Sequence, residues 1–588
     1  MLARGLLALL LVTPALVAQD LVKPNPAEAA LVEALHGDKA FAKGDGGKVA
    51  RGAWVKFFEA NYADQIKLAF NEEAAEIEAF LAANIDIKEM LYAAIDPETD
   101  NVVHALEVFR DLYKLGPEKV KAYPNVAVAV AVTWDNPKGV YDYRGHQVRT
   151  KSELPASVAA MDHVKNFEML ARIDGPLKQA VQFFPWEFLV HVVNHRTPTD
   201  ERDWALKNYL AKRSGVGKIY FDVEYDQGML RTQSEVCKLN DKPYTLPSIK
   251  KHGGVCAMQA DFAARVAKSL VVPAEYVRGE SNSGGLHAWV MWVEVKAVSK
   301  DKIDFALMSE GRYLGDQYYV GTVVDPRTGS DMTDRDMERR LTFLGLAPQA
   351  SRHADLLMRA YPVVREQRKL TAPQQVAYLK KVHDIFPSDE KAWLELAKLF
   401  KDGKATDEIQ TTLMADRALT TFARYPDFSW RVLDDLMTPV TDKAKRTRLF
   451  EKYVASYEIL ARPDLACEAR LKLAEYQAEA KDYKKAADGI AVTCLKFPSE
   501  GRYVPKMMTK LEEICKDYKG TSAGNGTKLL GEFYVKFLPL IPKRRGDEVS
   551  KYCVAMYEQG IAFLESNNKA VEAAGLKQQL NAIKAGRK

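Results

Sequence analysis

The hydrophobic pattern changes its period twice along this chain, and these changes constrain the fold more than any other feature. Before about residue 205, apolar residues recur at spacings of three and four, as in the segments 72–83 and 103–115. That spacing predicts amphipathic helices. Between about residues 215 and 345 the pattern alternates as in strands, and after about residue 350 it is helical to the end. The sequence therefore predicts an α+β region flanked by two helical regions.

The middle region contains one predicted helix, Val255–Leu270, among several predicted strands. The helix is rich in Ala and carries its apolar residues on one face. The predicted strands are Lys218–Tyr225, Glu275–Arg278, Ala288–Val298, Lys302–Leu307 and Tyr318–Val324. One helix followed by several strands of antiparallel type is an α+β pattern.

The first helical region has one segment whose structure the pattern leaves open. Breaks in the helical pattern fall at Gly44–Gly47, Asp96–Asp100 and Asp135–Gly139. Between the last two breaks lies the apolar run Val126–Trp134. It fits a buried strand or a buried helix equally well, because periodicity does not separate these two structures.

A short motif recurs in the last region. It reads Phe-Pro-Ser-Asp at 386–389, Tyr-Pro-Asp at 425–427 and Phe-Pro-Ser-Glu at 497–500. The three prolines are 39 and 72 residues apart, which is close to one and two tetratricopeptide units. We therefore expect a tetratricopeptide-like α-solenoid over residues 346–588, with Pro387, Pro426 and Pro498 at or just beyond helix ends. A plain helical bundle is the alternative.

Composition excludes several classes of protein. The chain has 588 residues, 47% of them hydrophobic and 28% charged, which fits three or four globular domains and excludes a largely disordered chain. Its 84 basic and 79 acidic residues nearly balance, and no run of five Lys or Arg residues occurs. Charge therefore gives no support for a nucleic-acid partner.

The N-terminus has the pattern of a secretory signal peptide. Arg4 precedes an apolar run from Leu6 to Ala18 that is too short to span a bilayer. We predict a signal peptide at residues 1–18, cut after Ala18, and hence a secreted or periplasmic protein. An uncleaved N-terminal anchor is the alternative. No later apolar run reaches spanning length, so we expect no integral membrane segment after cleavage.

The segment that enters the predicted helix of the middle region carries a candidate nucleophile, Cys256. Gly253 and Gly254 allow a tight turn and a close approach of the backbone to a ligand. Cys256 then falls in the first helical turn, where free N–H groups and the helix dipole favour an anion. This position predicts a lowered pKa for the thiol and an oxyanion-binding backbone.

Two further residues complete a candidate triad. His287 opens a predicted strand and is the best candidate for the base that takes the thiol proton. Asp325 ends a later predicted strand before Pro326 and would orient the imidazole. A Cys at a helix start with His and Asp on adjacent strands is a papain-type arrangement.

Four short blocks resemble the transglutaminase-like superfamily. They are Gly254-Val255-Cys256, Val272–Gly279, His287-Ala288-Trp289-Val290 and Val324-Asp325-Pro326. The blocks occur in that family's order. The resemblance covers about residues 215–345, implies a papain-like α+β core and gives the catalytic roles to Cys256, His287 and Asp325. Glu275 departs from the family pattern, which often has Arg after Pro-Ala.

The resemblance also implies a second oxyanion donor upstream of the cysteine, from an aromatic or amide side chain. Tyr220, Tyr225 and Gln233 are the candidates. A Tyr on an alternating strand is more often a packing residue than an oxyanion donor.

Other chemistry-bearing residues favour structural roles. His191 and His195 would share one helical face, but the apolar residues around them favour a structural helix over a metal site. Asp200–Arg202 would form a wall of the cleft or a contact between domains. Cys467 and Cys494 lie on predicted paired helices and would either form a disulfide or stay buried as free thiols.

These patterns predict an exported, transglutaminase-like cysteine acyl-transfer enzyme that hydrolyses a peptide or amide bond. We expect four parts: a signal peptide at 1–18, a mostly helical region at 19–205, a catalytic domain at 206–345 and the helical repeats at 346–588. The mechanism requires neither a metal nor a cofactor. The expected partners are a protein or peptide substrate and a protein bound by the C-terminal helices. A cross-linking transglutaminase, or a scaffolding protein with a vestigial cysteine site, is the alternative.

Overall fold

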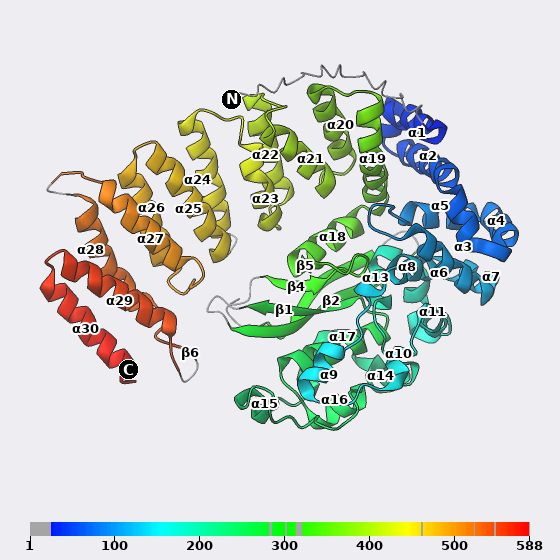
Figure 1. Cartoon of the computed structure of the whole chain (residues 1–588), viewed down its shortest axis with the longest axis horizontal. Helices are drawn as coiled ribbons and strands as arrows, with labels where there is room; N and C mark the ends of the chain where they lie inside the picture. Colours follow the sequence, from blue (N-terminus) through cyan, green and yellow to red (C-terminus); the bar gives the residue numbers. More distant parts are fainter. Residues whose placement is uncertain are drawn as a thin grey trace, which may run out of the picture.

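A computed structural model describes residues 25–280, 285–299, 303–312, 320–459, 462–521, 524–545 and 548–586 of the chain. The predicted signal peptide lies outside these residues. The described chain is mostly helical and contains a small five-stranded sheet near its centre (Figure 1). Among the described helices, none combines the length and the apolar character that a bilayer-spanning segment requires.

The sheet is antiparallel and follows one long helix, α17, Cys256–Ser269. Its order is β3-β2-β1-β4-β5. The strands are β1 Ala274–Glu280, β2 Leu286–Val298, β3 Ile303–Glu310, β4 Gly321–Val324 and β5 Asp331–Thr333. The predicted helix Val255–Leu270 is therefore confirmed, and so are the strands predicted after residue 270, within the described residues. The α+β pattern is confirmed with them.

The strand predicted at Lys218–Tyr225 is wrong. Residues Val216–Asp222 form a 3-10 helix, and Tyr225 makes only an isolated bridge to Gly254. The buried side chains are those of Val216, Ile219, Tyr220 and Val223. Their spacings of three and four are helical, and the apparent alternation of the sequence concealed them.

The two faces of the sheet are covered by different helices. Ala288, Val290 and Trp292 of β2 pack in one apolar cluster with α17. Trp289 and Met291, which alternate with them, pack in another cluster with helices of the N-terminal region. The sheet is therefore the middle layer of a three-layer unit.

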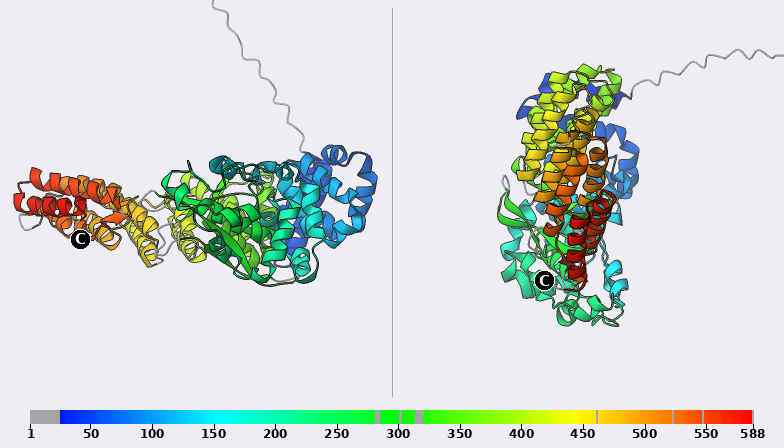
Figure 2. Two further views of the ribbon diagram at one scale, coloured as in Figure 1. Left: turned by 90° about the horizontal axis from the view of Figure 1, so that it is seen from below. Right: turned by 90° about the vertical axis from the view of Figure 1, so that its left-hand side faces the viewer.

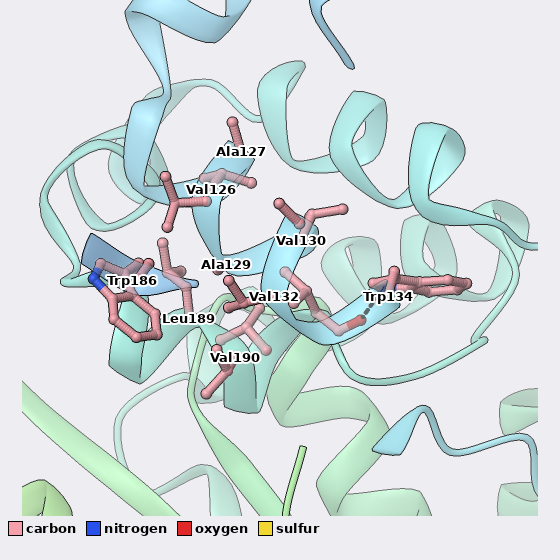
Figure 3. Packing of buried hydrophobic residues seen from close by; sticks show 14 of the residues in the cluster. Val126, Ala127, Ala129, Val130, Val132, Trp134, Trp186, Leu189 and Val190 are labelled. Carbon is pink, nitrogen blue, oxygen red and sulfur yellow. Dashed lines mark hydrogen bonds between the residues drawn. The ribbon is translucent and has the colours of Figure 1, made fainter. Parts of the chain in front are cut away.

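The segment left open by the sequence, Val126–Trp134, is a buried helix. It forms most of α8, Pro124–Trp134, and its side chains from Val126 to Trp134 are all buried. Figure 3 shows them packed against Trp186, Leu189 and Val190 of α13, Trp186–Val193. Because apolar contacts surround α8 on all sides, it shows no polar face.

The remaining helices of the first region confirm its helical prediction. They are α1 Pro26–His36, α2 Asp45–Asn61, α3 Ala63–Phe70, α4 Ala74–Ala83, α5 Ile85–Ala94, α6 Val102–Lys114, α7 Pro117–Ala122, α9 Arg144–Thr150, α10 Ala156–Ala159, α11 His163–Ala171, α12 Lys178–Phe183 and α14 Thr199–Tyr209. Two short helices, α15 Gln227–Arg231 and α16 Leu246–His252, lie in the middle region, where the sequence predicted one helix.

The described residues after the sheet are mostly helical and include one antiparallel pair of two-residue strands, β6 Arg544–Arg545 and β7 Glu548–Val549. Pro387 and Pro498 follow the ends of helices, and Pro426 begins one, as predicted. The helices are α18 Asp334–Leu346, α19 Pro348–Gln367, α20 Ala372–Ile385, α21 Glu390–Lys401, α22 Glu408–Thr421, α23 Pro426–Leu436, α24 Lys443–Ile459, α25 Pro463–Glu479, α26 Tyr483–Lys496, α27 Val504–Asp517, α28 Gly526–Phe537, α29 Lys551–Ser566 and α30 Ala570–Lys584.

The first and last regions pack together. Apolar residues of α1 and α2 share one cluster with α19, α20 and α21, so the start of the described chain packs against the first helices that follow the sheet. From α19 onward the helices follow an arc over the sheet (Figure 1), and the last of them project away from the rest of the molecule (Figure 2). The tetratricopeptide-like assignment stays a prediction.

Candidate active site

Cys256 is the first residue of α17, as the sequence predicts. Gly253 has a φ of +80°, and a Cβ atom there would lie 2.4 Å from the carbonyl oxygen of Glu224. A Cβ atom on Gly254 would lie 2.5 Å from Met258 of the same helix. Both glycines are therefore needed to bring the chain through this narrow turn into the helix.

The Cys256 sulfur is half-buried and faces the start of β2. The backbone N–H groups of Ala288, Ala257 and Cys256 itself act on the thiol to lower its pKa. The positive charge of Arg149, on α9, acts on the same thiol. These groups favour a thiolate, but burial outweighs them and raises the pKa of the Cys256 thiol. The lowered pKa predicted from the helix terminus is therefore wrong for the free protein.

His287 lies at the start of β2, and its ring is buried. Its Nε2 atom lies 2.6 Å from the carbonyl oxygen of Gly311, at the end of β3. Because a carbonyl only accepts hydrogen bonds, Nε2 carries the proton in the neutral ring and Nδ1 keeps its lone pair. Burial lowers the pKa of His287, so the ring is neutral at pH 7.

The Cys256 sulfur and the His287 ring approach β2 from different faces. Ala288 belongs to the face covered by α17, and strand alternation assigns His287 to the face of Trp289. The His287 and Trp289 rings are 6.2 Å apart between centroids. The structure thus brings the sulfur to the residue that follows His287 in the chain.

Asp325 does not lie at the imidazole, which corrects its predicted position. In the sheet, His287 is level with Gly279 of β1 and Gly321 of β4. Asp325 is two strands away from β2 and four residues beyond Gly321, which is about 13 Å along the strand direction. The sequence shows that Asp325 ends a strand but does not show which strand pairs with which.

Asp325 instead closes the turn between β4 and β5. One carboxylate oxygen accepts the backbone N–H of Arg327 at 2.9 Å and that of Thr328 at 3.4 Å. The other oxygen lies 3.4 Å from Arg340 of α18. These bonds are those of a structural Asx turn. Among the described residues, the group that holds the His287 ring is the Gly311 carbonyl.

The three oxyanion candidates have different positions. Tyr220 is buried and donates its O–H to the carbonyl of Ala288 at 3.1 Å, so it binds the peptide unit between Ala288 and Trp289. Tyr225 is half-buried, with its backbone bridged to Gly254. Gln233 is exposed in the loop after α15. Of the three, Tyr220 is hydrogen-bonded to a residue that contacts the sulfur.

Sequence reasoning missed residues of α9 and β1 that interact electrostatically with the cysteine. Tyr276 of β1 interacts with Cys256, because a charged Cys256 raises the pKa of the Tyr276 phenol. The positive charge of Arg149 lowers the pKa of both groups. The ring of His146, one turn before Arg149, lies 5.0 Å from that of Tyr276. Tyr276 is in one of the blocks that carry the resemblance, but no signal in the sequence connects Arg149 with Cys256.

A network of buried charges lies behind α17. His191 Nδ1 is 2.8 Å from Glu275, and Lys268 of α17 is 3.2 Å from the same carboxylate. Arg265 of α17 donates to Glu201 of α14 at 2.6 Å. The structural reading of the His191 helix is therefore supported, and the Asp200–Arg202 segment makes a contact between the predicted domains. Glu275, the departure from the family pattern, is one of the buried ion-pair partners.

Cys467 and Cys494 are free, buried thiols on α25 and α26. Burial raises the pKa of each thiol above its usual range. The sequence left open whether these two cysteines form a disulfide or stay as buried free thiols, and in the structure they are free thiols.

Comparisons with models of protein families, with curated proteins and with solved structures find no match to this chain.

Proposed function

We propose that this chain is an exported, transglutaminase-like cysteine acyl-transfer enzyme that hydrolyses a peptide or amide bond through a thioester on Cys256. The observation that carries the proposal is the position of Cys256, which opens α17 directly after the tight Gly253–Gly254 turn and packs in the cluster that joins α17 to β2. A neutral His287, fixed through Nε2, supports the role of general base.

In the proposed reaction, His287 Nδ1 accepts the thiol proton as the sulfur adds to the carbonyl carbon. The N–H groups of Ala257 and Ala288, which act on the thiol, would donate to the oxyanion. The carbon–nitrogen bond then breaks, and the leaving amine takes the proton from His287. Water hydrolyses the thioester, with His287 again as base. Because burial raises the pKa of Cys256, the reaction starts from the protonated thiol. The imidazole must reach the sulfur around the first residues of β2.

A second candidate is a scaffolding protein whose cysteine site is vestigial and whose C-terminal helices bind a partner. Three observations favour it. They are the raised pKa of Cys256, the position of Asp325 in a turn, and the assignment of the sulfur and the imidazole to different faces of β2. An amine in place of water as acceptor would make the enzyme a cross-linking transglutaminase.

Acetyl transfer from p-nitrophenyl acetate tests the enzyme proposal. We expect the wild type to release several equivalents of nitrophenolate per chain and to carry a transient acetyl group on the Cys256 peptide. Cys256→Ser should fold, because Ser is well tolerated at a helix start, but should release none. His287→Ala should lower turnover by about 10²-fold or more. Cys237→Ser, at a buried cysteine in the same unit, is the matched control. Unchanged turnover in Cys256→Ser would favour the scaffold.

A further inference from the structure

A cleft of about 480 Å³ opens between α27, α28 and α29, three of the last helices of the arc (Figure 1). The buried side chains of Cys515 and Leu530 and the half-buried ring of Phe563 form its apolar part. Exposed polar side chains, among them Thr527 and Ser566, lie at its rim. Sites for small ligands typically have volumes of about 300 to 1,000 Å³, so the cleft is large enough to hold one.

The acidic group of this cleft is the half-buried carboxylate of Glu512 on α27. Its Oε1 atom accepts the O–H of Tyr534 on α28 and, at 2.9 Å, the Nε2–H of Gln559 on α29. One oxygen is thus held by neutral donors from two neighbouring helices. These bonds fix the position of the carboxylate and leave its negative charge uncompensated.

Neighbouring acidic residues already have basic partners. Glu513, the next residue of α27, lies 2.8 Å from Lys510, and Glu558 of α29 lies 2.9 Å from Lys584. Within the described ranges, no Lys, Arg or His side chain lies within ion-pair distance of Glu512. Glu512 is therefore able to bind a cation from solvent without breaking an ion pair.

We propose that this cleft binds the ammonium group of an aliphatic amine, with the nitrogen at Glu512 and the methylene chain against Leu530 and Phe563. A carboxylate accepts charge-assisted hydrogen bonds from an ammonium group, and the apolar side chains cover the methylenes. A free amine and a lysine side chain of a bound peptide share this chemistry. The inference goes beyond the proposed function, because other helices than α17 build the cleft.

Isothermal titration calorimetry on the full chain tests the inference with three probes at neutral pH. The probes are 1,5-diaminopentane, the blocked tripeptide acetyl-Ala-Lys-Ala-amide and uncharged 1,5-pentanediol. We expect saturable binding of at least one of the two amines with a Kd below about 20 mM, and none of the diol in that range. Binding of the diamine alone would assign the cleft to free amines, and binding of the tripeptide alone would assign it to lysine side chains.

Glu512→Gln should weaken amine binding about five- to twentyfold, because it removes the charge and keeps an oxygen acceptor for the two hydrogen bonds. Glu513→Gln is the matched control, because it removes the same charge from the next residue of the helix, where Lys510 already pairs with it. It should change the Kd less than about twofold. Lys516, at the rim one turn after Glu512, is a cation that faces the ligand. Lys516→Ala should therefore strengthen binding about twofold.

Three results would overturn the inference. They are the absence of saturable binding of either amine, binding of the diol as tight as that of the amines, and equal amine affinity in wild type and Glu512→Gln. The first two are measured on the wild type, so they decide the matter even if a variant fails to fold. The acetyl-transfer assay on Cys256 is a separate measurement, and its failure would leave the inference untouched.

Discussion

The interior behind α17 and the interior of the C-terminal helices are built from different residues. Behind α17 the buried side chains include Glu201, Arg202, Asp261, Arg265, Lys268 and Glu275. In the helices from α26 to α30 the core is apolar, formed by Leu, Met, Ile, Phe and Tyr side chains. The ion pairs that these last helices form include exposed ones such as Lys484 with Asp488. Apolar layers tolerate small adjustments, whereas a buried charge is stable only while each of its partners is present.

Arg265 shows why the charged interior is sensitive. Its guanidinium is 2.6 Å from Glu201 and 3.7 Å from Asp261, and it stacks 4.0 Å from the ring centroid of Tyr143. Tyr244 donates to the same Asp261 at 2.9 Å. The arginine thus joins α14, α17 and the segment before α9 at one buried point.

The largest effect is expected from Arg265→Leu. The change leaves Glu201 and Asp261 buried without their cation, which should lower the free energy of unfolding by about 3–5 kcal/mol. Urea denaturation followed by circular dichroism measures it. The double variant Arg265→Leu with Glu201→Leu should recover part of the loss, since it removes one of the two unpaired carboxylates. A loss below about 1 kcal/mol in the single variant would mean that the two interiors do not differ as described.

The second prediction concerns the carboxyl group of Asp389, which is buried among the C-terminal helices. Asp389 belongs to the first Phe-Pro-Ser-Asp motif and caps α21 by accepting the N–H of Ala392 at 2.8 Å. Burial, helped by the neighbouring Asp355, raises the pKa of Asp389 to about 7. The folded state therefore binds the Asp389 proton more tightly than the unfolded state does. The contribution of this carboxyl to the free energy of unfolding is fully present below about pH 4 and is lost as the pH rises through 7.

Asp389→Asn keeps the cap and removes the titration, because Asn is as good an N-cap as Asp. The free energy of unfolding of the variant, measured relative to that of the wild type, should rise by about 2–4 kcal/mol from pH 5 to pH 8.5. Melting temperatures of both proteins across that range measure the difference. Parallel pH curves would contradict the raised pKa.

The third prediction compares the two residues that the sequence placed in one triad. His287→Ala should remove the base, whereas Asp325→Asn should keep at least one third of wild-type turnover on p-nitrophenyl acetate, because Asn also closes an Asx turn. Its effect should appear mainly as a lower melting temperature. If Asp325→Asn were as inactive as His287→Ala, Asp325 would act at the imidazole in solution and the placement in the turn would be wrong.

The sequence predicted the parts of the molecule that local periodicity determines. The strands after residue 270 were predictable because each buries one alternating face, and α17 because its apolar residues share one side. The 3-10 helix at Val216–Asp222 was missed because short helical spacing looks like alternation. Strand order and the pairing of Glu201 with Arg265 depend on residues far apart in the chain, and a single sequence carries no signal for them. The positions of Asp325 and Arg149 were unpredictable for this reason.

The smallest effect is expected from Lys484→Ala, the surface counterpart of the Arg265 change. Lys484 lies one turn before Asp488 on α26, with Nζ 2.5 Å from the carboxylate, and both side chains are about half exposed or more. Water solvates each ion after the partner is lost, and the Lys-to-Asp order along a helix is the less favourable one. The higher helix propensity of Ala offsets part of the lost attraction. We therefore expect the melting temperature to change by less than about 1 °C, at low salt and in 1 M NaCl alike. A drop comparable to that of Arg265→Leu would show that surface pairs, and not the apolar layers, hold the last helices together.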